Sequence, residues 1–162
     1  MGTPFTSIYK RFLQKITDYK LLELSDEQVV EMMLGWLESA IAKCKELRAD
    51  SLIYEYDDET DEYYFTHILS NLEREVLALG MVQEWLDPQI ESVLVTTQFI
   101  SGRQENFFAQ HNHLNMLMNL QTKIKRERKQ LISDYKTMHN SYLGTVEVVE
   151  EITDTTDDES GG

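Results

Sequence analysis

The stretch Ser25–Leu47 reads SDEQVVEMMLGWLESAIAKCKEL, and it decides what kind of fold this chain adopts. It opens with a capping box, in which the side chains of Ser25 and Gln28 satisfy each other's backbone N–H groups at a helix start. Apolar side chains then recur every three or four residues and form one stripe that faces a core. These are Val29, Met33, Trp36, Ala40, Cys44 and Leu47. We therefore predict a helix from Asp26 to about Arg48.

Similar signals predict helices on both sides of this stretch. Thr3 as N-cap and Pro4 in the first turn predict a helix that runs to about Thr17. A second capping box, Ser70–Glu73, precedes another apolar stripe, and we expect Pro88 to close that helix. The members of this stripe are Leu72, Val76, Leu79, Val82 and Leu86, with Trp85 beside them.

A long final helix is predicted from about Gln104 to Met138, a segment that contains no Pro or Gly. As one rod it would reach roughly 50 Å. Its apolar stripe is interrupted by Gln121, Lys125 and Arg128, so its later half is either solvated or meets a partner.

Two segments favour extended backbone. The runs 52–56 and 63–65 fit either a small hairpin or an ordered loop, and we favour the loop. After Gly144 the sequence becomes β-branched and alternating, and it ends in an acidic Thr/Ser/Gly stretch. We expect residues 142–162 to form an extended acidic arm that follows a helical domain of residues 1–141. The predicted fold is therefore all-α, a small helical bundle with one long C-terminal helix, with Trp36 and Trp85 in its core.

The arm has two interpretations. In the first it adds as a strand to a sheet of a partner, with Thr145, Val146, Val148 and Val149 as its contact residues. In the second it is disordered and only increases solubility.

Charge narrows the range of functions. The formal net charge of −14 argues against a nucleic-acid-binding surface, which needs clustered Lys and Arg. The excess lies in two places, the segment 55–62 with six acids and the segment 145–162 with seven acids and no base. No apolar run suits a membrane span or a signal peptide, and the single cysteine, Cys44, excludes an intrachain disulfide. We expect a protein of a reducing cytoplasm.

No motif predicts catalysis, a cofactor or a metal. His111 and His113 are two residues apart and point to different faces of a helix. The acidic run 57–62 lacks the ligand spacing and central Gly of an EF-hand. The basic cluster Lys123–Lys129, KIKRERK, is interpreted as a solvated face, with contact to an acidic segment of a neighbouring subunit as the alternative. We expect a non-enzymatic interaction protein.

Three stretches together resemble head-to-tail adaptor proteins, the neck or connector proteins of tailed bacteriophages of Gram-positive hosts. The first is Ile8–Lys45, with the link D-Y-x-L-L-E-L and the helix motif L-x-S-A-I. The second is Leu72–Ser92, with the pattern L-A-x-x-M-V-x-E-W-L-x-P-x-I. The third begins at Asn106 with NFFAQHNHLNMLMNLQ and ends at ISDY.

The resemblance implies a virion protein of the neck that is assembled in the host cytoplasm. Such a protein forms a ring of twelve copies beneath the portal protein, continues the DNA channel, and docks the next neck or tail component, a stopper or tail-completion protein. DNA would be passing cargo only, and no membrane is involved. The alternative is an acidic host-directed decoy or regulator that occupies a basic nucleic-acid-binding surface.

Overall fold

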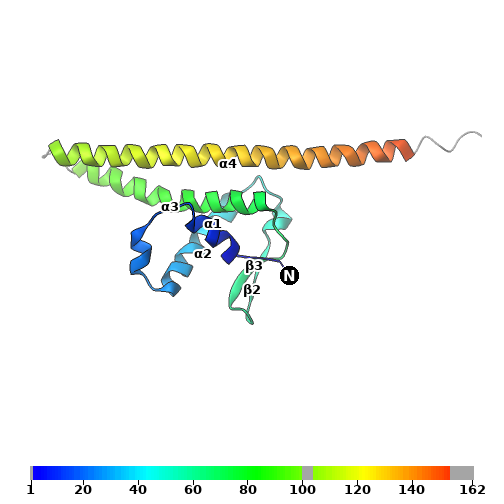
Figure 1. Ribbon diagram of the computed structural model, residues 1–162, viewed down its shortest axis with the longest axis horizontal. Helices are drawn as coiled ribbons and strands as arrows, with labels where there is room; N and C mark the ends of the chain where they lie inside the picture. The colour runs from blue at the N-terminus through cyan, green and yellow to red at the C-terminus, as the bar shows by residue number, and fades with distance from the viewer. Residues whose placement is uncertain (1, 100–103, 154–162) are drawn as a thin grey trace, which may run out of the picture.

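The computed structural model describes residues 2–99 and 104–153, which form a mostly helical protein with one small sheet (Figure 1). In chain order the elements are β1 (Thr3–Pro4), α1 (Thr6–Leu13), the 3₁₀ helix η1 (Tyr19–Glu23), α2 (Asp26–Lys43), the 3₁₀ helix η2 (Ala49–Leu52), β2 (Tyr54–Asp57), β3 (Glu62–Phe65), α3 (Asn71–Phe99) and α4 (Gln104–Thr153). The mostly helical character is confirmed. The all-α prediction is wrong, because the strands pair as an antiparallel sheet in the order β1-β3-β2.

The helix α2 begins as predicted. Ser25 N–H donates to Gln28 Oε1 at 3.1 Å, and Gln28 N–H donates to Ser25 Oγ at 3.3 Å, so the capping box is complete. The helix ends at Lys43, earlier than expected. Cys44 and Leu47 are buried nevertheless, because the chain that follows α2 still packs on the core. The second capping box also forms, with Ser70 N–H donating to Glu73 Oε2 at 2.7 Å.

The predicted helix start at Thr3 and Pro4 is wrong. Both residues form β1, in which Thr3 pairs with Phe65, and the helix begins only at Thr6. Thr3 Oγ1 accepts a hydrogen bond from Leu69 N–H at 2.7 Å, so it satisfies a distant segment instead of its own helix. A Cβ on Gly2 would lie 1.6 Å from the Phe65 carbonyl oxygen, which shows how closely these two backbone segments approach each other. Tertiary pairing overrides the local cap signal here.

The segments 52–56 and 63–65 form a hairpin, so the preferred loop was wrong. Asp57 closes its turn by accepting from Glu59 N–H at 3.0 Å and from Thr60 Oγ1 at 2.9 Å. Asp61 takes a positive φ of 56°, which Asp tolerates better than most residues. The hairpin is stabilised by β1 and by an aromatic cluster that neither run reveals alone. Its members are Phe5, Tyr54, Tyr63 and Phe65.

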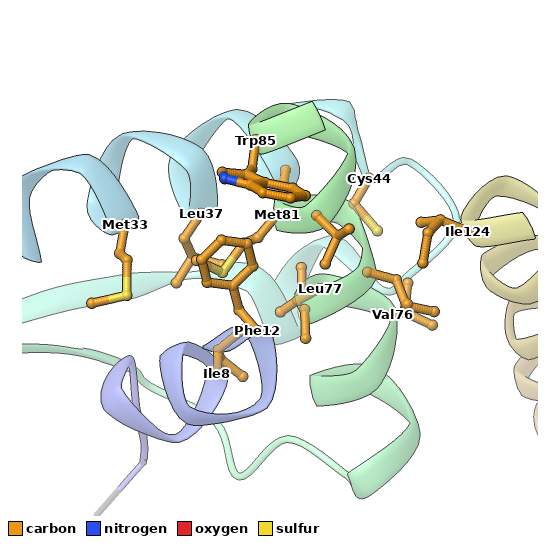
Figure 2. Packing of buried hydrophobic residues seen from close by; sticks show 14 of the residues in the cluster. Ile8, Phe12, Met33, Leu37, Cys44, Val76, Leu77, Met81, Trp85 and Ile124 are labelled. Carbon is orange, nitrogen blue, oxygen red and sulfur yellow. The ribbon is translucent and has the colours of Figure 1, made fainter. Parts of the chain in front are cut away.

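The core surrounds the first half of α3. Figure 2 shows Phe12 of α1 and Leu37 of α2 packing on this helix, with Ile124 of α4 near Val76. Within residues 76–82, six α3 side chains are at most 1% exposed: Val76, Leu77, Ala78, Leu79, Met81 and Val82. A Cβ on Gly80 would lie 3.0 Å from the Ala40 Cβ, so glycine lets α2 approach α3 closely. Three helices therefore pack around α3.

Pro88 does not end α3, contrary to the prediction. The helix continues to Phe99, and Figure 1 shows its two halves at an angle to each other. A proline inside a helix costs about 3 kcal/mol, because it removes one hydrogen bond and crowds the preceding turn. Beyond Pro88, Ile90 is buried and Val93 packs against the core, and this apolar burial opposes the cost.

The last helix is longer than predicted. It begins at Gln104 as expected but runs to Thr153. The prediction of an extended arm is therefore wrong for residues 142–153, because their backbone is helical. This part includes Thr145, Val146, Val148 and Val149. A helix closes its backbone hydrogen bonds within itself, whereas a lone strand leaves them unpaired. The predicted domain boundary at 141/142 falls inside α4, and residues 154–162 lie outside the described residues.

The two tryptophans differ in burial. Trp85 is 8% exposed, and its indole N–H donates to Asp18 Oδ2 at 2.9 Å. Trp36 is only half-buried and packs against the ring of Phe12, with the centroids 5.4 Å apart. The core assignment is therefore confirmed for Trp85, while Trp36 lies at the edge of the core.

A charged cluster fixes α1 against α3. Glu75 accepts from Arg11 Nη1 at 3.1 Å and also pairs with Lys15. Burial opposes ionisation of Glu75, but the hydrogen bonds from Lys15 and Arg11 outweigh it and hold its pKa below the usual value. Because the folded-state pKa is lowered, this carboxylate stabilises the fold above its unfolded-state pKa and loses that contribution as the pH falls through the folded-state pKa.

We predict that Glu75→Gln reduces stability at neutral pH and flattens its pH dependence below pH about 4.5, the range in which an ordinary glutamate takes up its proton. Urea unfolding at several pH values measures this. Equal stability losses for the variant at pH 7 and well below pH 4 would contradict the assignment.

We also predict that Trp85→Ala lowers the free energy of unfolding by about 3–5 kcal/mol, as expected for an emptied core site. Trp36→Ala should cost clearly less, because part of its ring already faces water. Thermal and urea unfolding compare the two. Trp85→Phe is the control that keeps most of the volume but removes the hydrogen bond to Asp18.

Candidate interaction surfaces

The helix α4 is the feature that most clearly exceeds the needs of the fold. Its 50 residues span about 75 Å. Figure 1 shows it running antiparallel to α3 and extending past the compact body formed by α1, α2 and the sheet. Tyr135 still reaches Glu73, near the start of α3, with an O···O distance of 3.4 Å. The part from Asn140 to Thr153, roughly 20 Å long, projects beyond α3.

One face of α4 holds it on the body. Leu114, Leu117, Ile124 and Ile132 are buried on this face. Gln121 Nε2 donates to Asp87 Oδ1 at 2.8 Å, and Arg128 Nε donates to the Val76 carbonyl at 3.4 Å. Arg128, a member of the predicted basic cluster, is therefore partly covered. The other bases of that cluster are exposed, as predicted for a solvated face.

The face of α4 opposite this buried face carries a row of exposed polar side chains, which we call the polar row. Its members recur every three or four residues: Asn112, Asn115, Asn119, Thr122, Arg126, Gln130, Ser133, Thr137 and Asn140. Only Arg126 among them is charged. A long helix of this kind presents amides and hydroxyls to whatever it faces.

The two flanks of α4 differ in charge. One flank, the basic row, consists of Met118, Lys125, Lys129 and Lys136. The other flank, the acidic row, consists of Met116, Glu127, Asp134 and Met138. At 100° per residue, each row lies about 90° around the axis from the buried face. All eight side chains are exposed. Within the described residues none of the five charged ones forms an ion pair.

A cavity of about 600 Å³ lies where α4 leaves the body. Tyr135 stacks on His139 in its wall, with ring centroids 6.2 Å apart and planes nearly parallel. Two exposed apolar side chains, Ile68 at 80% and Met138 at 67%, border it. The other lining residues are Arg48, Ser51, His67, Ser70, Asn71, Leu72 and Glu73.

The β2–β3 hairpin carries the acidic segment 55–62 and points away from α4 (Figure 1). The N–H of Glu59 and the hydroxyl of Thr60 lower the pKa of Asp57. A hydrogen bond to Asp61 raises the pKa of Tyr56 to about 12. Glu62 accepts from Thr6 N–H at 3.0 Å, at the start of α1. Two of these acids thus shape the turn and one caps a helix.

The other candidate residues from the sequence are not brought together in one site. His111 and His113 both lie on exposed positions of α4. In the described parts of the chain, no group of three or more His, Cys, Asp or Glu side chains could hold a metal ion. Among those same residues, no helix combines the length and the apolar composition that a membrane crossing requires. The four proposed arm contacts lie on the projecting end of α4.

Sequence reasoning missed the two flanks of α4. The sequence allowed the basic cluster to be interpreted only as a solvated face, because the direction of the buried face was unknown. The two flanks are defined by their position relative to the buried face, so they cannot be identified before that face is known.

Comparison with known proteins gives no relatives: no family model, no curated protein and no solved structure matches this chain.

We predict that Leu117→Ala destabilises the protein by about 2–5 kcal/mol, because it removes a buried contact between α3 and α4. Met116→Ala, one residue earlier and 60% exposed, should change the stability by less than about 0.5 kcal/mol. Urea unfolding tests both. Similar losses for the two variants would mean that α4 does not pack on α3 through this face.

Proposed function

We propose that this protein is a structural virion protein, a head-to-tail adaptor of a tailed bacteriophage. In this role it forms a ring beneath the portal protein, continues the DNA channel, and docks the next neck or tail component. Its work is binding, and no side chain acts as a catalyst.

The observation that carries the proposal is the excess length of α4. In a protein that acts alone, a helix needs to be only as long as the part that packs on the core. Here one helix of 50 residues extends well past the body. An isolated helix end is only marginally stable in water, so a long projecting helix favours an assembly in which other chains cover it. The exposed apolar residues along the α3–α4 hairpin fit the same role. They are Leu94, Val95, Phe108, Met116 and Met118.

The charge distribution suits a channel that DNA passes through. A wall of lysines and arginines would bind phosphates and retain the DNA. The polar row of α4 carries one charge in nine positions, and the hairpin carries six acids. We assign the polar row to the channel wall, where amides and hydroxyls neither hold nor strongly repel the DNA.

The projecting end of α4 is assigned to the portal contact. Thr145, Val146, Val148 and Val149 remain the contact positions, but they dock as part of a helix in a groove. Strand addition, which the sequence suggested, does not fit the helical backbone.

A second candidate function rests on the hairpin. Six acids close together on an exposed turn imitate a run of phosphates, which favours the acidic decoy that occupies a basic nucleic-acid-binding surface. The adaptor proposal needs α4, whereas the decoy needs only the hairpin.

The test is binding of the full chain to a phage portal ring, measured by pull-down and by electron microscopy of the complex. The adaptor should bind in a symmetric ring. Deletion of residues 142–162 should abolish binding while the melting temperature stays nearly unchanged, because every core residue within the described part of the chain precedes residue 142.

Variants with Asp58, Glu59 and Asp61 changed to Asn or Gln form the matched control, and they should bind the portal like the wild type. Full binding by the truncated chain would contradict the docking role of α4. No portal binding by the full chain, together with displacement of DNA from a basic protein, would favour the decoy.

A further inference from the structure

The two flanks of α4 complement each other level by level. Positions that are two residues apart in the sequence differ by about 3 Å along the helix axis, which is less than the reach of a lysine side chain. Met116 and Met118 are at nearly one level, as are Lys125 and Glu127, and then Asp134 and Lys136. In each of these pairs one member lies on the acidic row and the other on the basic row.

The two rows of one helix cannot meet each other, because they lie on opposite flanks. They can meet when two copies of α4 lie side by side and parallel with no shift along the axis. The basic row of one copy then faces the acidic row of the next. Lys125 and Lys129 come near the neighbour's Glu127, Lys136 comes near its Asp134, and the methionines pack together.

We propose that copies of this protein associate through this lateral contact between parallel α4 helices, the basic row of one against the acidic row of the next. The contact is heterologous, since the two partners use different surfaces. Heterologous contacts repeat from copy to copy and form a ring when the rotation closes. This lateral contact would be the subunit contact of the proposed adaptor. Closure into a ring rests on that proposed function, whereas the contact itself does not.

The remaining faces of α4 are compatible with this contact. The body covers the buried face through α3, and the polar row stays open on the opposite side, so neighbours can approach along both flanks. Gln130 Nε2 donates to Asp134 Oδ1 at 2.9 Å, which leaves the other carboxylate oxygen for a lysine. Lys123 borders the acidic row, but it lies about 40° further toward the polar row than Glu127 and can extend into solvent.

The contact should be weak and sensitive to salt. Exposed ion pairs contribute little individually, and salt screens them further. The net charge of −14 also makes whole molecules repel one another. Association should therefore appear at high protein concentration.

Two charge-reversed variants test the pairing. The first carries Lys125→Glu, Lys129→Glu and Lys136→Glu, so both of its rows are acidic. The second carries Glu127→Lys and Asp134→Lys, so both of its rows are basic. Sedimentation velocity at high concentration should show at least tenfold weaker association for each variant alone. An equimolar mixture should recover the wild-type association, because each acidic row again meets a basic one.

General charge repulsion predicts the opposite for the second variant. Its two acid-to-lysine changes move the net charge from −14 to −10, so repulsion alone would make it associate more strongly than the wild type. Arg126→Glu on the polar row is the matched control and should change association less than twofold. Because all altered side chains are exposed, circular dichroism melts should match the wild type throughout.

A mixture that stays monomeric overturns the pairing, as does a wild type that stays monomeric at the highest concentration reached. Portal binding is measured separately on the same variants. Variants that lose self-association but still bind the portal singly would leave the adaptor function standing and support the lateral contact. A wild type that associates as proposed yet ignores the portal would overturn the function and not the contact.

Discussion

The first half of α3 has to bury side chains on every side of its axis, and the rest of the structure depends on that requirement. Val76, Leu79 and Met81 point in different directions, yet all are at most 1% exposed. One neighbour covers only one stripe of a helix, so α1, α2 and α4 are all needed. Gly80 and Ala40 let α2 come close, and the Glu75 cluster holds α1. Loss of any one of these neighbours would expose apolar surface of α3.

This arrangement also determines which parts of α4 are available. The helix uses one face and the middle of its length to cover α3, and nothing in the described chain requires its flanks, its polar row or its last turns. The charge pattern follows that division. Partly buried polar groups such as Arg128 and Gln121 have partners on α3, whereas the lysines and carboxylates on the flanks do not form ion pairs within the described residues. A helix that is both anchored and open on three sides is suited to assembly.

The hairpin and α4 lie on opposite sides of the body, so the strongest acidic cluster and the basic row cannot neutralise each other within one molecule. The protein keeps a charge asymmetry that a compact fold would otherwise reduce. In an assembly this asymmetry orients neighbours, since like-charged surfaces are kept apart and opposite ones are drawn together. The energetic contribution of each pair is small, so in the ring that we propose the contact would depend on its repetition from copy to copy.

Local signals in the sequence were sufficient to predict α2 with its capping box, the start of α3, the start of α4 and the burial of Trp85. Each of these depends on residues within one or two helical turns. The tertiary structure alone decided that Thr3 and Pro4 form a strand, because their partners lie sixty or more residues away. It decided in the same way that the acidic segment is a hairpin, that α3 passes Pro88, and that α4 has flanks at all. The direction of a buried face is set by what the helix packs against, and no spacing along the chain contains that direction.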